Sequence, residues 1–150
     1  MPAWRIVVGS DDAGFDYKEV IKKDLEANDL VASVADVGVD AEGHTNYPTI
    51  ATSAAEMVAR GEADRAILLC GTGLGVAVAA NKVKGIRAAL CWSVELARLA
   101  REHNDANVLA MGARLTGIDM AKACVTAFLD TPFAGGRHQR RVDKLFSPSC

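Results

Sequence analysis

The fold of this chain is constrained most by a short apolar run that recurs five times along it. The runs span 6–8, 31–37, 66–69, 88–91 and 107–111. Each is followed by a glycine-rich or polar turn and then by a segment of helical period, at 15–27, 48–60, 76–83, 93–103 and 118–129. The third and fifth runs are apolar throughout, which is typical of strands buried on both faces. The pattern predicts an α/β protein, a three-layer α/β/α sandwich on a parallel sheet.

Residues at the ends of the predicted helices support these boundaries. Pro48 suits a first helical turn, Gly61 stands just past a helix end, and Thr116 with Asp119 has the spacing of a capping box. The segment 135–141 precedes a last helix that we expect to end near Phe146, before a short frayed tail. Because 150 residues is the usual length of one domain, we expect a single domain over 1–150.

Composition and the order of residues exclude several classes of protein. The net charge of −2 gives no general basic field for nucleic acid or an anionic membrane. An apolar run follows the first residues at once, which leaves no room for a secretory signal, and no apolar stretch approaches the roughly 20 residues of a membrane span. We therefore expect a cytoplasmic protein. The cysteines lack metal-ligand or CxxC spacing and are expected to be free thiols: Cys70, Cys91, Cys124 and Cys150.

Ligands of parallel α/β sheets bind beyond the carboxyl ends of the strands, where the loops here are 9–14, 38–47, 70–75, 92–93 and 112–114. The glycine loop 70–75 does not match the common phosphate-binding loops. A dinucleotide loop needs Gly where Val76 stands, a cysteine phosphatase needs Arg there, and a Walker A loop needs Gly-Lys followed by Ser or Thr. A phospho-receiver domain would need Asp where Cys70 stands.

Cys70 and the glycines that follow it are the best candidates for chemistry. Backbone N–H groups at the start of a helix stabilise a thiolate, so Cys70 can serve as a base. The same N–H groups, free of side chains at Gly71, Gly73 and Gly75, can bind a phosphate or an oxyanion formed during reaction. A base beside such a site is suited to proton abstraction next to a carbonyl. The alternative is a small buried hydrophobe beside a closely packed turn.

Basic residues in the last part of the chain form a second group of candidates. Arg137 and Arg141 are four residues apart, so a helix would place them on one face, where they could bind one phosphate; a solvated basic turn is the alternative. His103 lies beside polar neighbours, and histidine is the residue type best suited to proton transfer near neutral pH, although a histidine there is also an ordinary helix cap. His44 is interpreted as a loop residue without a role.

Several motifs in order resemble ribose-5-phosphate isomerase B and its galactose-6-phosphate isomerase relatives, from Arg5 to about Phe146. They are Ser10-Asp11-Asp12-Ala13-Gly14, Asn46-Tyr47-Pro48, Cys70-Gly71-Thr72-Gly73-Leu74-Gly75, Ala79-Ala80-Asn81-Lys82, Gly85-Ile86-Arg87-Ala88, the stretch from His103 to Leu109, Gly112-Ala113-Arg114 and Gly135-Gly136-Arg137-His138. The resemblance implies a five-stranded Rossmann-like sheet, a homodimer or tetramer with shared active sites, and no metal or organic cofactor.

The resemblance also implies the reaction, which is aldose–ketose isomerisation of a sugar phosphate through a cis-enediolate. By position, Cys70 would move the proton between C1 and C2, and Thr72 with the N–H groups of 71–75 would hold the enediolate. His103, helped by Asp11, would open the sugar ring. The remaining positions would bind substrate (Asp12, Tyr47, Gly71, Gly73, Gly75, Asn104) or its phosphate (Arg114, Arg137, Arg141).

Two departures from the family pattern concern the substrate. Asp12 stands where the family commonly has His near the phosphate, and a carboxylate there repels a phosphate dianion. Asn46 replaces a common Asp, which only removes a charge. Overall similarity favours ribose 5-phosphate, with erythrulose 4-phosphate or an allose or galactose 6-phosphate as alternatives. A non-catalytic phosphosugar sensor is the alternative of another class.

Overall fold

The structure is a computed structural model that describes residues 3–38 and 46–147. Strands and helices alternate along the chain, as the recurring apolar runs predict. The elements are β1 (Trp4–Ser10), the 3₁₀ helix η1 (Asp12–Gly14), α1 (Phe15–Glu26), β2 (Val31–Asp36), α2 (Tyr47–Ala59), β3 (Arg65–Cys70), α3 (Leu74–Asn81), β4 (Ala88–Leu90), α4 (Val94–Asn104), β5 (Val108–Gly112), α5 (Ile118–Asp130) and α6 (Arg137–Lys144).

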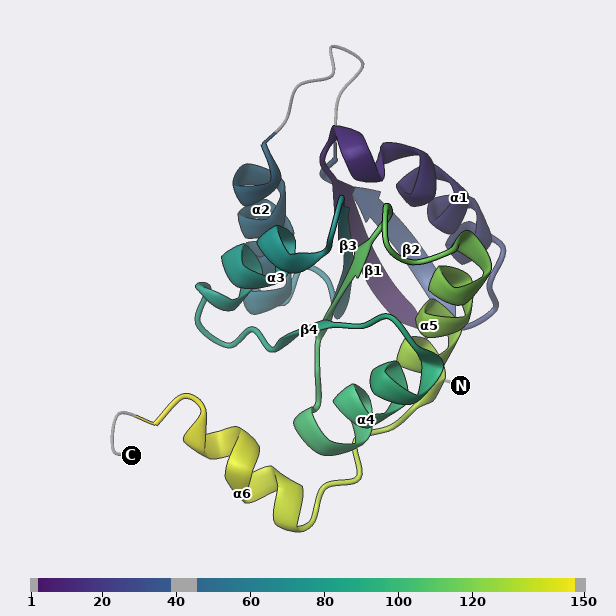
Figure 1. The fold of residues 1–150 in the computed structure, drawn as a ribbon. Coiled ribbons are helices and arrows are strands. Elements are labelled where there is room, and N and C mark those ends of the chain that lie inside the picture. Colours follow the sequence, from purple (N-terminus) through teal and green to yellow (C-terminus); the bar gives the residue numbers. More distant parts are fainter. Residues whose placement is uncertain (1–2, 39–45, 148–150) are drawn as a thin grey trace.

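The strands form one parallel five-stranded sheet in the order β2-β1-β3-β5-β4. Helices α2 and α3 cover one face, and α1, α4 and α5 cover the other, whereas α6 extends away from the sheet (Figure 1). The predicted three-layer α/β/α sandwich is confirmed.

The central strand β3 shows why its sequence is apolar throughout. Ile67 and Leu69 point into the core beneath α1, α4 and α5, while Leu68 and Cys70 point into the core beneath α2 and α3. Every residue of β3 and of β5 is buried. Since β3 lies in the middle of the sheet, its carboxyl end places Cys70 at the centre of the sheet's carboxyl edge.

Local expectations are confirmed at some helix ends and wrong at others. Pro48 lies in the first turn of α2, and Gly61 follows its end with φ of +75°. The predicted capping box of Thr116 and Asp119 is wrong, because α5 starts after Gly117 without a side-chain cap. The N–H of Thr116 instead donates to the carbonyl of Gly112 at 2.9 Å, and this hydrogen bond keeps Thr116 in the preceding turn.

Two further findings concern the remaining sequence expectations. No helix within residues 3–38 and 46–147 is both long and apolar enough to cross a membrane. Cys70, Cys91 and Cys124 are free thiols, as expected, and each is buried. His44 and Cys150 lie outside the described residues.

Candidate active site

Three loops meet at the carboxyl edge of the sheet, and backbone hydrogen bonds join them. The N–H of Asp11, after β1, donates to the carbonyl of Leu69 at 3.3 Å. The N–H groups of Ala113 and Arg114, after β5, donate to the carbonyls of Cys70 and Gly71, both at 2.9 Å. The loop that carries Cys70 is therefore held on both sides by its neighbours.

Cys70 ends β3 with its thiol turned toward the glycine loop. Its Sγ accepts a hydrogen bond from the N–H of Gly73 at 3.1 Å, and the residue is 5 % exposed. Gly73 has φ of +84°, a conformation that side chains disfavour, and a methyl group built there would lie 2.5 Å from Leu90 Cδ1. Gly73 thus allows the turn that directs an N–H group at the sulfur just before α3 begins.

Thr72 lies within the same loop, and Tyr47 packs against it. The hydroxyl of Thr72 accepts from the N–H of Leu74 at 3.2 Å. The ring of Tyr47 lies directly over Gly75, where an added methyl group would be 2.5 Å from Cε1. Helix α3 begins at Leu74, two residues before the predicted start, so Gly75 belongs to its first turn. N–H groups in the first turn of a helix lack intrahelical acceptors, so the turn at Gly75, beneath an aromatic wall, is suited to binding an anion.

Asp11 and Arg114 flank this loop from its two neighbours. The carboxylate of Asp11 accepts from the N–H of Gly14 at 3.0 Å and caps η1, whose first residue is Asp12. The guanidinium of Arg114 lies over Gly71, since a methyl group there would be 3.4 Å from its Nη1. An arginine beside free N–H groups is a suitable site for an anionic oxygen. We call Asp11, Asp12, Tyr47, Gly71, Thr72, Gly73, Gly75, Cys70 and Arg114 the carboxyl-edge group.

The other predicted site residues lie at the opposite edge of the sheet. His103 and Asn104 end α4, just before β5, and β5 starts beside Ala66 at the beginning of β3. From Ala66 to Cys70 the strand advances by about 13 Å at 3.3 Å per residue. One chain therefore does not bring His103 to Cys70 or to Asp11.

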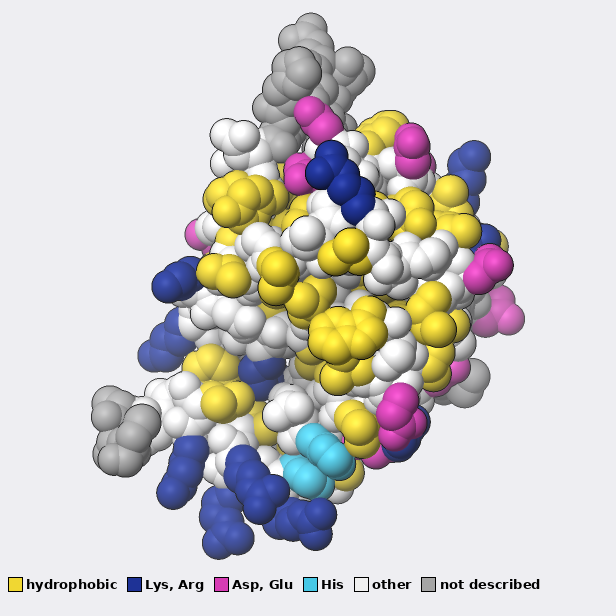
Figure 2. Space-filling model, viewed as in Figure 1, with side chains coloured by type: hydrophobic (Ala, Val, Ile, Leu, Met, Phe, Trp, Pro, Cys, Tyr) yellow, Lys and Arg dark blue, Asp and Glu magenta, His cyan; other side chains and the backbone are white. Residues whose placement is uncertain are grey.

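Helix α6 brings the predicted phosphate-binding arginines to this same edge. The N–H of Ala134 donates to the carbonyl of Glu102 at 3.1 Å, and the ring of His138 stacks on that of His103 with centroids 4.5 Å apart. Arg137 and Arg141 lie on α6, as the helical spacing predicts. Figure 2 shows histidines and a cluster of basic side chains together at this end of the molecule. We call His103, Asn104, Arg137 and Arg141 the amino-edge group.

The electrostatics of the amino edge suit a dianion. The pKa of His138 lies below its ordinary value because the ring is partly desolvated and faces the positive charges of His103, Arg137 and Arg141. A bound phosphate would relieve this repulsion. The structure thus divides the predicted site into a base with an oxyanion-binding loop and a separate basic group that includes a histidine.

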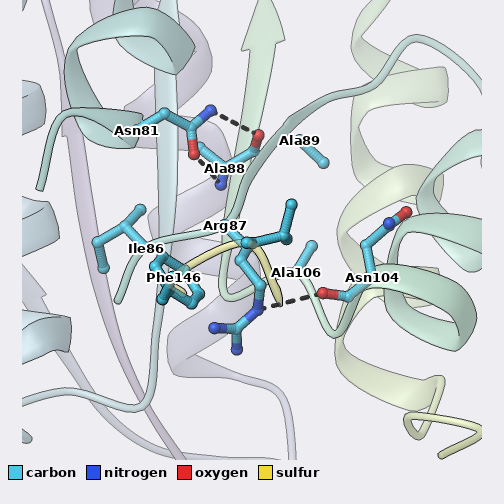
Figure 3. A pocket seen from close by; sticks show the side chains of 9 residues that line it. Asn81, Ile86, Arg87, Ala88, Ala89, Asn104, Ala106 and Phe146 are labelled. Atoms are coloured by element: carbon cyan, nitrogen blue, oxygen red, sulfur yellow. Dashed lines mark hydrogen bonds between the residues drawn. The ribbon is translucent and has the colours of Figure 1, made fainter. Parts of the chain in front are cut away.

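Arg87, for which the sequence predicts no role, holds the amino edge together. Its Nε donates to the carbonyls of Asn104 at 3.1 Å and of Asp105 at 2.9 Å, and Asp105 has φ of +47°. Beside it lies a cavity of about 340 Å³, lined by Asn81, Ala88, Asn104 and Phe146 among others (Figure 3). In Figure 3, the side-chain amide of Asn81 donates to the carbonyl of Ala88 and accepts from the N–H of Ala88. The one sequence signal for this role is the place of Arg87 in the motif Gly85-Ile86-Arg87-Ala88, which resembles the family.

The comparison with protein families decides the assignment. The model described as Ribose/Galactose Isomerase matches residues 6–145. The chain belongs to the ribose/galactose isomerase family. D-erythrulose-4-phosphate isomerase 2 of Mycolicibacterium smegmatis is 56 % identical over 132 residues, which cover 87 % of each chain. Ribose-5-phosphate isomerase B of Escherichia coli is 44 % identical over 141 residues, covering 94 % of this chain and 93 % of that one.

A solved structure of the ribose/galactose isomerase family has the same fold. Ribose-5-phosphate isomerase B of Mycoplasma genitalium with bound ribulose-5-phosphate has a TM-score of 0.88 and 40 % identity, covering 97 % of this chain and 96 % of that one. This chain is therefore a sugar-phosphate aldose–ketose isomerase. Within the described ranges, no three His, Cys, Asp or Glu side chains are grouped so that they could hold a metal ion.

Proposed function

We propose that this chain interconverts a ketose phosphate and an aldose phosphate through a cis-enediolate, with D-erythrulose 4-phosphate as its preferred substrate. The observation that carries the reaction is the contact between Cys70 Sγ and the N–H of Gly73, directly before the first turn of α3. A thiolate held by such a donor can take a proton from carbon while neighbouring N–H groups bind the oxygen that becomes negative.

The proton balance of the reaction requires one base and one oxyanion site. The Cys70 thiolate removes a proton from C1 of the ketose, and the negative charge develops on O2 of the enediolate. Thr72 and the loop N–H groups other than those of Gly73 and Leu74 stabilise that charge. A proton then moves from O1 to O2, and the thiol returns its proton to C2, which gives the aldose.

A second copy of the chain supplies the amino-edge group to this site in our proposal. The carboxyl-edge group contains Arg114 but lacks the histidine and the arginine pair, which lie at the far end of β3 in the same chain. The face between the two edges exposes large apolar side chains: Leu74 is 56 %, Val78 60 % and Trp92 61 % exposed. Apolar side chains also gather across the middle of the face drawn in Figure 2. Two copies packed face to face in opposite directions would cover this area and join each Cys70 loop to the other copy's His103.

The choice of a four-carbon substrate rests on Asp12 and on the comparisons. The 56 % identical relative is named for erythrulose 4-phosphate, whereas the ribose-5-phosphate isomerase B relative is 44 % identical. Asp12 supplies a carboxylate where the family commonly has a phosphate-side histidine. We propose that Asp12 accepts a hydrogen bond from a sugar hydroxyl, and that Arg114 of one copy with Arg137 and Arg141 of the other bind the phosphate.

Ribose 5-phosphate, which the resemblance described in the sequence analysis favours, is the second candidate substrate. Steady-state rates on erythrulose 4-phosphate and ribose 5-phosphate, measured side by side with EDTA, separate the two. We expect kcat/KM to be at least tenfold higher for the tetrose, and Asp12→His to move the preference toward the pentose. A pentose preference in the unaltered protein would refute the choice of substrate. Phosphosugar binding without turnover on either compound, and without turnover of allose or galactose 6-phosphate, would refute the isomerase itself.

Ring opening offers a further distinction between the substrates. Ribose 5-phosphate closes a furanose ring through O4, but in erythrose 4-phosphate the C4 oxygen carries the phosphate, so no such ring forms. If His103 opens the ring, His103→Ala should lower kcat on ribose 5-phosphate about 100-fold or more while changing the rate on erythrulose 4-phosphate much less. Equal losses on both substrates would assign His103 to substrate binding or to the proton transfer instead.

A further inference from the structure

A second basic hollow lies at the amino edge of the sheet, apart from the groups assigned to isomerisation. It has a volume of about 420 Å³ and is lined by four arginines and two aspartates: Arg5, Asp64, Arg65, Arg87, Arg101 and Asp105. Trp4 forms part of its wall. An adjoining hollow of about 380 Å³ shares Trp4, Arg65 and Arg101 and extends toward residues 131–133. We call the two together the arginine cavity.

The two carboxylates of the arginine cavity are already bound. Asp64 accepts from Arg5, with an Nη2–Oδ1 distance of 2.9 Å. Asp105 pairs with Arg101 at 2.8 Å, and Arg87 approaches its other oxygen at 3.5 Å. Because four guanidinium groups share two carboxylates, the cavity retains a surplus of positive charge.

Arg65 carries the least compensated charge of the four. It is 5 % exposed, and its guanidinium carbon lies 3.9 Å from the centroid of the Trp4 ring. Within the described part of the chain, the guanidinium of Arg65 donates one hydrogen bond, from Nη1 to the carbonyl of Phe128, and no carboxylate lies at ion-pair distance from it. Burial, followed by the charge of Arg101, lowers the pKa of Arg65 to about 10, although the more distant charges of Asp105 and Asp64 oppose this shift. A buried charge without a directly bound counter-ion is costly, and an anion would remove much of that cost.

We propose that the arginine cavity binds a phosphate group at Arg65 and Arg101, in a site separate from the isomerase site. A guanidinium offers paired N–H donors that match two phosphate oxygens, and the Trp4 ring fixes the plane of the Arg65 group. The volume exceeds that of inorganic phosphate, so the site also admits a small phosphate monoester. The proposal depends on neither the isomerase substrate nor its mechanism.

Trp4 provides a direct readout of binding. The chain has two tryptophans, so Trp92→Phe leaves Trp4 as the only one, in contact with Arg65. We expect its fluorescence to change saturably with inorganic phosphate at constant ionic strength. Arg65→Met in this background should weaken the apparent affinity at least tenfold, because a charge-assisted hydrogen bond is lost. The Arg137→Ala/Arg141→Ala variant, which alters the proposed substrate phosphate site, should bind phosphate as before.

The outcomes separate the possible sources of the phosphate group and the possible failures. Tighter binding of glycerol 3-phosphate than of inorganic phosphate would identify a phosphate monoester as the ligand, and equal binding would identify free phosphate. An unsaturable signal, or equal affinity with and without Arg65→Met, would overturn the proposal. So would loss of the signal in the Arg137→Ala/Arg141→Ala variant. If Arg65→Met does not fold, Arg65→Lys keeps the charge but not the paired donors and should still weaken binding severalfold.

Isomerase activity measured in the same samples keeps the two proposals apart. Arg65→Met should keep the kcat of its Trp92→Phe parent in phosphate-free buffer, since Arg65 belongs to neither edge group. An inactive unaltered protein, together with saturable phosphate binding at Trp4 in the Trp92→Phe protein, would refute the proposed function and leave the arginine cavity supported.

Discussion

The substitution Gly112→Ala tests whether strand β5 positions the backbone of the glycine loop 70–75. A methyl group at Gly112 would lie 2.4 Å from the carbonyl oxygen of Thr72 and 2.5 Å from its carbonyl carbon. Ordinary contact begins near 3.4 Å, so the peptide after Thr72 would have to move by about 1 Å. Both obstacles are backbone atoms, and a change of rotamer cannot relieve the overlap.

The size of the effect follows from this displacement. Overpacking of a buried contact costs about 1–3 kcal/mol of unfolding free energy. In a chain of this size, each kcal/mol lowers Tm by about 2–4 °C. A shift of about 1 Å in the loop that orients Cys70 should also reduce kcat about 100-fold, since catalytic geometry tolerates little misplacement. We therefore expect Gly112→Ala to lose more activity than its stability loss alone would cause.

Gly117→Ala is the matched control for this experiment. A methyl group at Gly117 would contact nothing within 4 Å, and its φ of −63° is open to any residue. Urea unfolding and isomerase rates at a temperature where both variants are fully folded would compare the two. Wild-type kcat and an unchanged unfolding midpoint in Gly112→Ala would show that the loop is not held by β5 as the structure indicates.

Three further predictions concern thiols, pH and phosphate. In a Cys150→Ser background, iodoacetamide should label native protein at Cys70 before Cys91 and Cys124. Burial raises the pKa of the Cys91 thiol to about 12 and also raises that of Cys124. Peptide mass spectrometry would measure the order, and labelling of Cys91 or Cys124 before Cys70 would contradict this expectation. Burial raises the pKa of Asp36, but hydrogen bonds from Lys18 and the Gly38 N–H bring it below its usual 3.8. This contribution to stability is therefore present above pH 3.8 and is lost as the pH falls through the lower folded value, and unfolding curves should show that Asp36→Asn removes that part of the pH dependence. Arg141→Ala should raise KM about tenfold or more with a smaller change in kcat, and an unchanged KM would place the phosphate elsewhere.

The order of elements could be predicted from the sequence because each apolar run corresponds to one strand of the sheet. Strand and helix positions agree within about two residues wherever burial is continuous, as at β3 and β5. The errors occur at turns. Whether α5 is capped by Thr116 depends on a hydrogen bond to Gly112, and no local pattern reveals that competition.

The division of the site into two edges was implicit in the chain order. His103 ends a helix that leads into a strand, so it must lie at the amino edge of a parallel sheet, whereas Cys70 ends a strand and must lie at the carboxyl edge. The arginine cavity is different in kind. Trp4, Arg65 and the carbonyl of Phe128 come together only through the neighbouring positions of β1 and β3 and the end of α5, which the sequence does not specify.

The separation of the two edge groups has a genetic consequence. If each site joins the carboxyl edge of one chain to the amino edge of another, an allele with Cys70→Ala and an allele with His103→Ala each lack activity on ribose 5-phosphate, the substrate whose ring His103 would open. In a mixed pair, one site carries both defects and the other carries neither. Cells expressing both alleles equally would hold mixed pairs as half of their dimers, and should recover about a quarter of the normal activity. Two lesions in the same edge group would give no such complementation, so crosses between alleles would map which edge each residue serves.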